Sequence, residues 1–322
     1  MPSEFALIRR HFTRPASHTD LAVGDDAALI RARPGMQLAI STDMLVAGTH
    51  FFPDTEPEDL GWKTLAVNVS DLAAMGAEPR WVVLAASLPT ADEPWIAAFA
   101  RGFFACCAAF GIDAIGGDTT RGPLNLCPTI FGELPTGQAI TRDGARPGDE
   151  LWISGAPGRA ALGLAHLRGQ ISLAAAARDD CLAALLRPQP RVALGMALRG
   201  IASAMLDVSD GLLGDLDHIL EQSATGAELD AAALPVTALN DACGDPARAF
   251  QACIAGGDDY ELLFTAPPAR HDEIAALSVR LGLPLHPVGR MTDAPRQIRL
   301  RHPDGRVEAL AARGYDHFGR DA

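Results

Sequence analysis

The sequence predicts an α/β protein with two domains, and three observations support this. The 322 residues suit two domains of ordinary size, at ~100–200 residues each. Hydrophobic residues make up 48% of the chain and charged residues 21%, which leaves enough apolar side chains to build real cores. Segments typical of strands and of helices alternate in both halves, as expected of α/β or α+β folds. Periodicity alone leaves the order of the strands open.

The first half of the chain contains three predicted strands and two predicted helices. From Pro57 onward, apolar residues recur every three or four positions until Gly76, which is the spacing of one buried helix face. A second helical pattern carries Phe99, Phe103 and Phe110 along one side. The predicted strands are 36–40, 81–87 and 112–115, the last ending at Gly116-Gly117, and the predicted helices are 57–76 and 93–110.

Proline and glycine crowd into residues 132–149, so we place the domain boundary in this stretch. The predicted domains are residues 1–137 and 138–322. In the second domain, Pro188 and Pro190 stand where a further helix would begin. The predicted strands of this domain are 151–154 and a segment at 205–206, and its other predicted helices are 160–167, 178–186 and 212–222.

The charge balance excludes several classes of protein. Lys and Arg total 27 against 40 Asp and Glu, a net charge of −13, so nucleic acid is not expected as the main partner. Lys63 is the only lysine of the chain, and it lacks the upstream glycine of a phosphate-binding loop. A P-loop NTPase and an ordinary protein kinase are therefore both excluded.

Nothing in the chain predicts a membrane span or an export signal. The longest apolar run, residues 81–88, is far shorter than the ~20 residues that a spanning helix needs. The first four residues lack the basic-then-apolar pattern of a signal peptide, so we expect a cytoplasmic protein. The six cysteines form no C-x-x-C pair, and we interpret them as core residues rather than disulfides or zinc ligands.

Six acidic clusters share one pattern, which is an aspartate at the end of an apolar stretch beside Gly, Ser or Thr. They lie at residues 24–26, 41–43, 70–71, 116–120, 207–211 and 256–259. Mg²⁺ prefers carboxylate oxygens, and neighbouring glycines let a polyphosphate approach the backbone closely. Asp71 lies inside an apolar helical pattern, where a buried carboxylate without a partner is costly. The clusters therefore suggest a site that holds several magnesium ions for a nucleotide or phosphoester.

Each cluster taken alone also has a purely structural explanation. Aspartate beside glycine is common in turns, and Asp210, just before Gly211, would also serve as a helix N-cap and nothing more. His50 is a lone loop histidine, a kind that is more often structural than functional. No Ser-His-Asp or Cys-His arrangement competes with the magnesium hypothesis. The pattern shared by all six clusters is what favours the metal site.

The ordered set of motifs resembles the thiamine-monophosphate kinase family, and the resemblance spans nearly the whole chain. Each motif alone is a weak signal, but their order along the chain is highly specific. The matching segments are VGDDA (23–27), STDMLV (41–46), GTHF (48–51), GWKTLAVNVSDLAAMGA (61–77), GGDTT (116–120), RDGARPGD (142–149), DVSDGL (207–212), GDDYEL (257–262) and GYDHF (314–318).

This resemblance implies both an architecture and a reaction. The family is similar to aminoimidazole ribonucleotide synthetase, with an N-terminal α/β domain whose sheet pairs with a second subunit and an α/β C-terminal domain. The resemblance implies that ATP binds between the domains and that its γ-phosphate passes to thiamine monophosphate, giving thiamine diphosphate and ADP. We expect a homodimer and a direct in-line transfer without a phospho-enzyme, because phosphoryl transfer depends mostly on positioning and charge neutralisation.

The resemblance also assigns roles to individual residues. The implied ligands of several Mg²⁺ ions are Asp26, Ser41, Thr42, Asp43, Asp71, Asp118, Asp207 and Asp210, of which Asp43, Asp71 and Asp210 are the expected catalytic carboxylates. The implied ATP contacts are Gly117, Asp118, Arg142 and Ser209, and the implied thiamine monophosphate contacts are His50, Glu261 and Tyr315. Relatives often carry a tyrosine near the nucleotide where this chain has Ala100, so adenine is not expected to stack on an aromatic side chain there.

Two alternative functions remain open at this point. One is another ATP-dependent synthetase of the same superfamily, and the other is a non-catalytic nucleotide-binding protein. A selenophosphate synthetase is expected to carry a reactive cysteine near its N-terminus, whereas the first cysteine here is Cys106. A hydrogenase maturation relative is expected to end in an acceptor cysteine, whereas this chain ends in Ala322.

Overall fold

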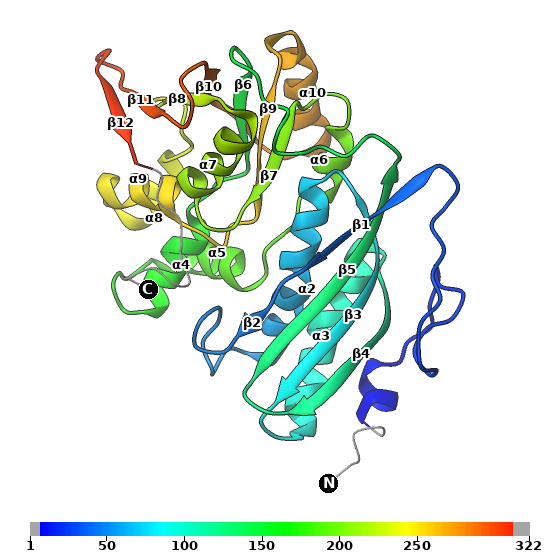
Figure 1. Cartoon of the computed structure of the whole chain (residues 1–322). Coiled ribbons are helices and arrows are strands. Elements are labelled where there is room, and N and C mark those ends of the chain that lie inside the picture. The colour runs from blue at the N-terminus through cyan, green and yellow to red at the C-terminus, as the bar shows by residue number, and fades with distance from the viewer. Residues whose placement is uncertain (1–6, 312–322) are drawn as a thin grey trace. The chain divides into compact units, whose positions relative to one another are not determined.

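The computed structural model describes residues 7–311, which fall into two compact units (Figure 1). Among the described residues, unit 1 comprises 7–72 and 77–137, and unit 2 comprises 73–76 and 138–311. Each unit combines a mixed β-sheet with α-helices, so the predicted α/β class is confirmed. Within residues 7–311, no helix is both long enough and apolar enough to cross a membrane.

Unit 1 is built on a five-stranded sheet in which β1, β5, β3 and β4 lie in that order and β2 pairs with β5. β5 runs antiparallel to β1, β2 and β3, while β3 and β4 are parallel and connected through α3. In Figure 1, α2 and α3 lie on the same face of this sheet. The elements are η1 (Ile8–Phe12), β1 (Met36–Thr42), β2 (Leu45–Val46), α2 (Pro57–Ala74), β3 (Glu78–Leu88), α3 (Glu93–Phe110), β4 (Asp113–Arg121) and β5 (Asn125–Pro135).

Helix α3 has the bounds that its sequence predicts, because its end signals are local. The Asp92 carboxylate accepts a hydrogen bond from the Trp95 N–H at the N-terminus, and Pro94 occupies the first turn. Gly111 ends the helix in the left-handed conformation, with φ of 66°. Apolar side chains such as Phe99 and Phe103 are buried on one face, as their spacing predicts.

Strand β4 is longer than the predicted segment 112–115, since it continues through the two glycines to Arg121. Its parallel neighbour β3 pairs with it along this whole length. Gly117 makes the close approach feasible, because a Cβ atom there would lie 2.0 Å from the Leu84 carbonyl oxygen. Asp118 therefore lies within a strand and not after one.

Unit 2 is built on a seven-stranded sheet with the order β12-β11-β8-β10-β6-β9-β7. All neighbouring strands are antiparallel except β8 and β11, which are parallel. The strands are β6 (Glu150–Ser154), β7 (Ala204–Val208), β8 (Gly226–Asp230), β9 (Glu261–Ala266), β10 (Leu285–Thr292), β11 (Ile298–Arg301) and β12 (Val307–Leu310). The helices are α4 (Arg159–Leu167), α5 (Ala175–Leu186), α6 (Val192–Ala197), α7 (Leu212–Ser223), α8 (Thr237–Cys243), α9 (Pro246–Ala255), η2 (Pro268–Arg270) and α10 (His271–Leu281).

Strands β6 and β9 lie inside the sheet of unit 2 and are buried on both faces, so their middle residues form continuous apolar runs. Leu151 and Ile153 of β6 pack into a cluster that also contains residues of α4, α5, α7 and α9. Trp152, between them, packs on the opposite face with Phe264 and residues of α6 and α10. The period-2 alternation of a strand thus builds a sheet between two apolar layers. The ends of these strands carry the polar groups described below.

Candidate functional site

In unit 1, the end of β1 and the last turns of α2 are tied together by polar side chains. The Ser41 hydroxyl donates a hydrogen bond to Oδ2 of Asp71. The Asp43 N–H donates to Oδ1 of Asn68 at 3.0 Å, and Asn68 is fully buried in α2. These bonds bring Ser41, Asp43 and Asp71, three predicted metal ligands, to one place in the unit.

Thr42 is oriented differently from Ser41, because successive side chains of a strand point to opposite faces. Its hydroxyl donates to the Pro128 carbonyl at 2.8 Å and accepts from the Thr129 hydroxyl at 3.1 Å. Both partners belong to β5, which pairs with β1. The predicted pair of hydroxyl ligands is therefore divided between the two faces of the sheet.

His50 lies in the turn that follows β2, and its ring orientation is set by a backbone bond. The Val46 N–H donates to Nδ1 of His50 at 3.0 Å, so Nδ1 acts as an acceptor. The neutral ring then carries its proton on Nε2. The His50 N–H donates to the Val46 carbonyl at 3.0 Å, which closes the same turn.

The other predicted ligands of unit 1 are exposed. Asp26 lies in an irregular segment, where its N–H donates to Oδ1 of Asp25 at 2.9 Å. Asp118 lies on β4, at the edge of the sheet, beside Gly117. Ala100, by contrast, is buried inside α3 and faces the core of the unit.

In unit 2, Asp207, Ser209 and Asp210 lie where β7 ends and α7 begins. The buried carboxylate of Asp215, in the first turn of α7, accepts hydrogen bonds from the N–H groups of Ser209 and Asp210, both at 3.0 Å. Burial, with the nearby charges of Asp207 and Asp210 adding to it, raises the pKa of Asp215 from 3.8 to about 7. Asp215 thus fixes the backbone of one predicted metal ligand, Asp210, and of one predicted ATP contact, Ser209.

The turn before β9 is joined to this loop through its backbone. The N–H of Asp258 donates to the Ser209 carbonyl and that of Tyr260 to the Val208 carbonyl, both at 2.9 Å. Asp258 and Tyr260 have positive φ angles of 67° and 53°, which is unfavourable for residues other than glycine. A strained turn of this kind persists only where its surroundings hold it in place.

Asp259, between those two residues, caps helix α4. Its carboxylate accepts hydrogen bonds from the Gly158 N–H and, at 3.0 Å, from the Ala160 N–H. Burial raises the pKa of Asp259 from 3.8 to about 7, although both hydrogen bonds and Arg159 oppose that shift. This member of the 256–259 cluster therefore has a structural role.

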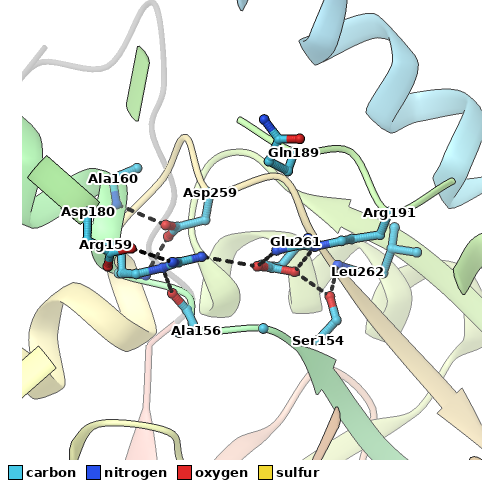
Figure 2. Close-up of polar contacts among 12 residues, drawn as sticks. Ser154, Ala156, Arg159, Ala160, Asp180, Gln189, Arg191, Asp259, Glu261 and Leu262 are labelled. Atoms are coloured by element: carbon cyan, nitrogen blue, oxygen red, sulfur yellow. Dashed lines mark hydrogen bonds and ion pairs between the residues drawn. The ribbon is translucent and has the colours of Figure 1, made fainter. Parts of the chain in front are cut away.

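Glu261 begins β9 and is surrounded by hydrogen-bond donors, as Figure 2 shows. Arg191 binds it with two nitrogens, Nε to Oε2 at 2.7 Å and Nη2 to Oε1 at 2.6 Å. The Ser154 hydroxyl donates to Oε2 at 2.6 Å. Burial alone would lower the pKa of Arg191, but the bonds to Glu261 and its charge outweigh this and raise that pKa. The Glu261 side chain is 1% exposed.

Two predicted contacts remain. Arg142 is exposed in the segment between β5 and β6, where its carbonyl accepts a hydrogen bond from the Ser223 hydroxyl at 2.8 Å. Tyr315 lies outside the described residues. Across the described part of the chain, His, Cys, Asp and Glu side chains form no group of three or more placed to hold a metal ion. The predicted metal ligands are divided between the two units.

Sequence reasoning missed three residues of this region, namely Ser154, Arg191 and Asp215. Arg191 follows Pro188 and Pro190, a segment that was interpretable only as a helix start. Asp215 stands five residues after Asp210, near enough to suggest a bond back to the loop. No sequence signal connects Ser154 or Arg191 to Glu261, because the partners are 107 and 70 residues apart.

Comparisons with known proteins agree with the motif order. Residues 24–134 match the AIR synthase related protein N-terminal domain, and residues 146–300 match the corresponding C-terminal domain. The chain is 44% identical over 320 residues to the thiamine-monophosphate kinase of Escherichia coli (strain K12), with 98% of each chain covered.

Solved structures give the same result. A crystal structure of thiamine-monophosphate kinase from Stenotrophomonas maltophilia K279a is 46% identical, has a TM-score of 0.85, and covers 94% of this chain and 97% of its own. AaThiL complexed with AMPPCP and TMP is 27% identical, has a TM-score of 0.78, and covers 98% of this chain and 97% of its own. The resemblance and the two-domain architecture expected from the motifs are thereby confirmed. This chain belongs to the thiamine-monophosphate kinase family of AIR synthase related proteins.

Proposed function

We propose that this protein transfers the γ-phosphate of ATP to the phosphate of thiamine monophosphate, giving thiamine diphosphate and ADP. The observation that carries the proposal is the match to thiamine-monophosphate kinases over 98% of the chain at 44% identity. The relative complexed with AMPPCP and TMP supports ATP as the phosphate donor. We assign this reaction to two domains. The proposed N-terminal domain, residues 1–137, binds the nucleotide, the metal ions and a second subunit. The proposed C-terminal domain, residues 138–322, completes the active site.

The donor side of the reaction is assigned to Gly117, Asp118, Arg142 and Ser209. Arg142 is exposed, and its guanidinium offers a planar fork that suits a phosphate group. The Ser209 backbone is held by Asp215, so its hydroxyl is carried on a fixed turn. These residues would bind ATP and hold its phosphates in line with the acceptor.

Mg²⁺ fits the donor set of this chain, since carboxylate and hydroxyl oxygens are the hard ligands that it prefers. The Ser41 hydroxyl already contacts the Asp71 carboxylate, so two of these oxygens lie side by side. The proposed ligands are Asp26, Ser41, Thr42, Asp43, Asp71, Asp118, Asp207 and Asp210. When bound, the ions neutralise the charge of two polyanions that would otherwise repel each other. Asp43, Asp71 and Asp210 are the proposed catalytic carboxylates.

The acceptor side is assigned to His50, Glu261 and Tyr315. The acceptor oxygen is already ionised at neutral pH, so the reaction needs no general base. His50 has its Nδ1 occupied by the Val46 N–H, and its Nε2 would donate to the acceptor. We therefore propose direct in-line transfer, with His50 as a binding group and with no phospho-enzyme.

A homodimer is proposed from exposed apolar side chains on one face of the unit 1 sheet. Ser41 points toward α2, so Leu38 and Ile40 point to the opposite face. These side chains are 40% and 60% exposed, and Ile40 lies opposite Phe131 of β5. A second copy of the chain would cover this apolar face. Light scattering on an Ile40→Glu variant should then show a shift toward monomer, while wild-type protein at the same concentration stays dimeric.

The cytoplasm is the proposed location. All six cysteines are free thiols, and four of them are buried. Free thiols are typical of a reducing compartment, which supports this location.

The test of the function is to mix protein, ATP and Mg²⁺ with thiamine monophosphate and to separate the products by chromatography. Thiamine diphosphate and ADP should form in equal amounts. If no thiamine diphosphate forms but another phosphate monoester is phosphorylated, the acceptor of this enzyme is that other compound and not thiamine monophosphate. ATP binding without turnover on any acceptor would instead favour a non-catalytic nucleotide-binding protein.

A further inference from the structure

Ser223, the last residue of α7, holds the loop that carries Arg142 through two hydrogen bonds of one hydroxyl group. Its Oγ donates to the Arg142 carbonyl at 2.8 Å and accepts from the Ala145 N–H at 3.1 Å. Because a serine hydroxyl has a single proton to donate, these two bonds fix the direction of that proton. The hydroxyl therefore bridges two backbone groups that lie three residues apart and closes the loop between them.

The same loop is packed closely against the chain that leads into β7. The Thr141 carbonyl accepts from the Met205 N–H at 3.2 Å. A Cβ atom at Gly144 would lie 1.9 Å from the Ser203 carbonyl oxygen, so the two backbones are in direct contact there. Backbone contacts on both sides of residue 142 leave the loop little freedom, and a side chain that it carries starts from a defined position.

The side chain of Arg142 extends from this fixed backbone and is exposed. Within residues 7–311, no other group forms a hydrogen bond or an ion pair with its guanidinium. An arginine loses rotamer freedom when it binds an anion, and ordering a mobile loop at the same time would add to that cost. The bond from Ser223 reaches the carbonyl of Arg142 itself, so it lowers this second cost before the anion binds.

We infer that Ser223 is a positioning residue for ATP, which fixes the backbone of Arg142 so that the guanidinium meets a phosphate group of the nucleotide. This inference rests on the proposed function, which assigns Arg142 to ATP. Helix α7 then supports both proposed ATP contacts of unit 2, since Asp215 in its first turn holds the Ser209 backbone. In this role Ser223 acts through Arg142 and not on the nucleotide directly.

The test is a calorimetric measurement of the affinity for a non-hydrolysable ATP analogue in the presence of Mg²⁺. It compares wild-type protein with Ser223→Ala, Arg142→Ala and the double variant. Arg142→Ala should weaken binding by about thirtyfold, the value of a hydrogen bond to a charged group. Ser223→Ala should weaken it by about three- to tenfold. The double variant should bind as Arg142→Ala does, because the guanidinium through which Ser223 acts is already missing.

The matched control is Ser278→Ala on α10 of the same unit. Its hydroxyl also donates to a backbone carbonyl beyond the end of its helix, that of Leu283, at 2.8 Å, and both serines are half-buried. This control should bind the analogue as wild type does.

The conservative variant Ser223→Thr keeps the hydroxyl and should restore the wild-type affinity. Thermal unfolding checks that each variant is folded, which is expected because alanine is the best helix former. If Ser223→Ala does not fold, Ser223→Cys takes its place, since a thiol is only a weak donor and acceptor.

Three outcomes would overturn the inference. One is an equal effect of Ser223→Ala with and without the Arg142 guanidinium, since Ser223 would then act on the fold alone. Another is wild-type affinity of Ser223→Ala. The third is wild-type affinity of Arg142→Ala, which would remove Arg142 from the ATP site.

Failure of the proposed function gives a different result. A wild-type protein that forms no thiamine diphosphate, yet shows the predicted pattern with the ATP analogue, would overturn the proposed acceptor and support the role of Ser223.

Discussion

Two sets of acidic side chains, one in each unit, are held in different ways. In unit 1, Asp26 and Asp118 are exposed. In unit 2, Glu261, Asp215 and Asp259 are only 1%, 4% and 8% exposed, and each accepts at least two hydrogen bonds from protein donors. A carboxylate whose lone pairs are occupied by the protein shapes the backbone around it, whereas an exposed one keeps them available for a cation.

The difference shows that residue type alone does not assign a role. Asp259 belongs to an acidic cluster of the same pattern as the others, yet it caps a helix. Asp71 belongs to another, and one of its partners is the Ser41 hydroxyl, a group that can itself bind a metal. What separates the two cases is the set of donors that the fold places around each carboxylate.

The strongest test of this comparison is Asp71→Asn in unit 1. The amide oxygen retains the bond from Ser41, but the charge that a cation requires is lost. We expect kcat to fall by about 10³-fold, equivalent to about 4 kcal/mol, while the circular dichroism spectrum stays unchanged. Steady-state kinetics over a range of Mg²⁺ concentrations measures this. Full activity with the wild-type magnesium dependence would remove Asp71 from the site.

The next test is Asp215→Ala in unit 2. It leaves the N–H groups of Ser209 and Asp210 without their acceptor, so the free energy of unfolding should fall by roughly 3 kcal/mol. Urea denaturation measures the change. Glu221→Ala on the same helix is the control, because its pair with Arg296 is exposed and should contribute less than about 1 kcal/mol. Equal stabilities of the two variants would contradict a backbone role for Asp215.

The pH dependence of stability tests whether Asp259 is as buried as its contacts indicate. Its pKa is raised to about 7 in the folded protein, so the folded state favours the protonated carboxyl. Its stabilising contribution is fully present below pH 4 and is lost as the pH rises through 7. The stability difference between wild type and Asp259→Asn should therefore shrink by roughly 2 kcal/mol between pH 5 and pH 8. A difference that stays constant in urea titrations at both pH values would mean that Asp259 is solvated.

The smallest expected effect is that of His50→Ala. Loss of one binding group should raise KM for thiamine monophosphate about tenfold, while kcat stays near the wild-type value. KM for ATP serves as the internal control and should not change. Loss of turnover at saturating acceptor would give His50 a part in the chemical step and would weaken the distinction between charge-neutralising and binding residues.

Secondary structure was the most predictable part of this chain. Helix α3 has the predicted bounds because Asp92 and Gly111, its end signals, act within one turn of the chain. Strand β4 was predicted too short, because its continuation depends on pairing with β3 and not on its own glycine-rich sequence. The sequence therefore predicts the bounds of an element correctly where the hydrogen bonds that define those bounds join residues close together in the chain.

The candidate site was predictable as a set of residue types but not as an arrangement. The sequence alone determined that aspartates recur beside glycine and hydroxyl residues, and it determined the family through the order of those motifs. Only the tertiary structure decided that Asp259 caps a helix and that Arg191 binds Glu261, 70 residues away. The physical reason is that the role of a carboxylate depends on its burial and on its donors, and both come from segments that meet only when the chain folds.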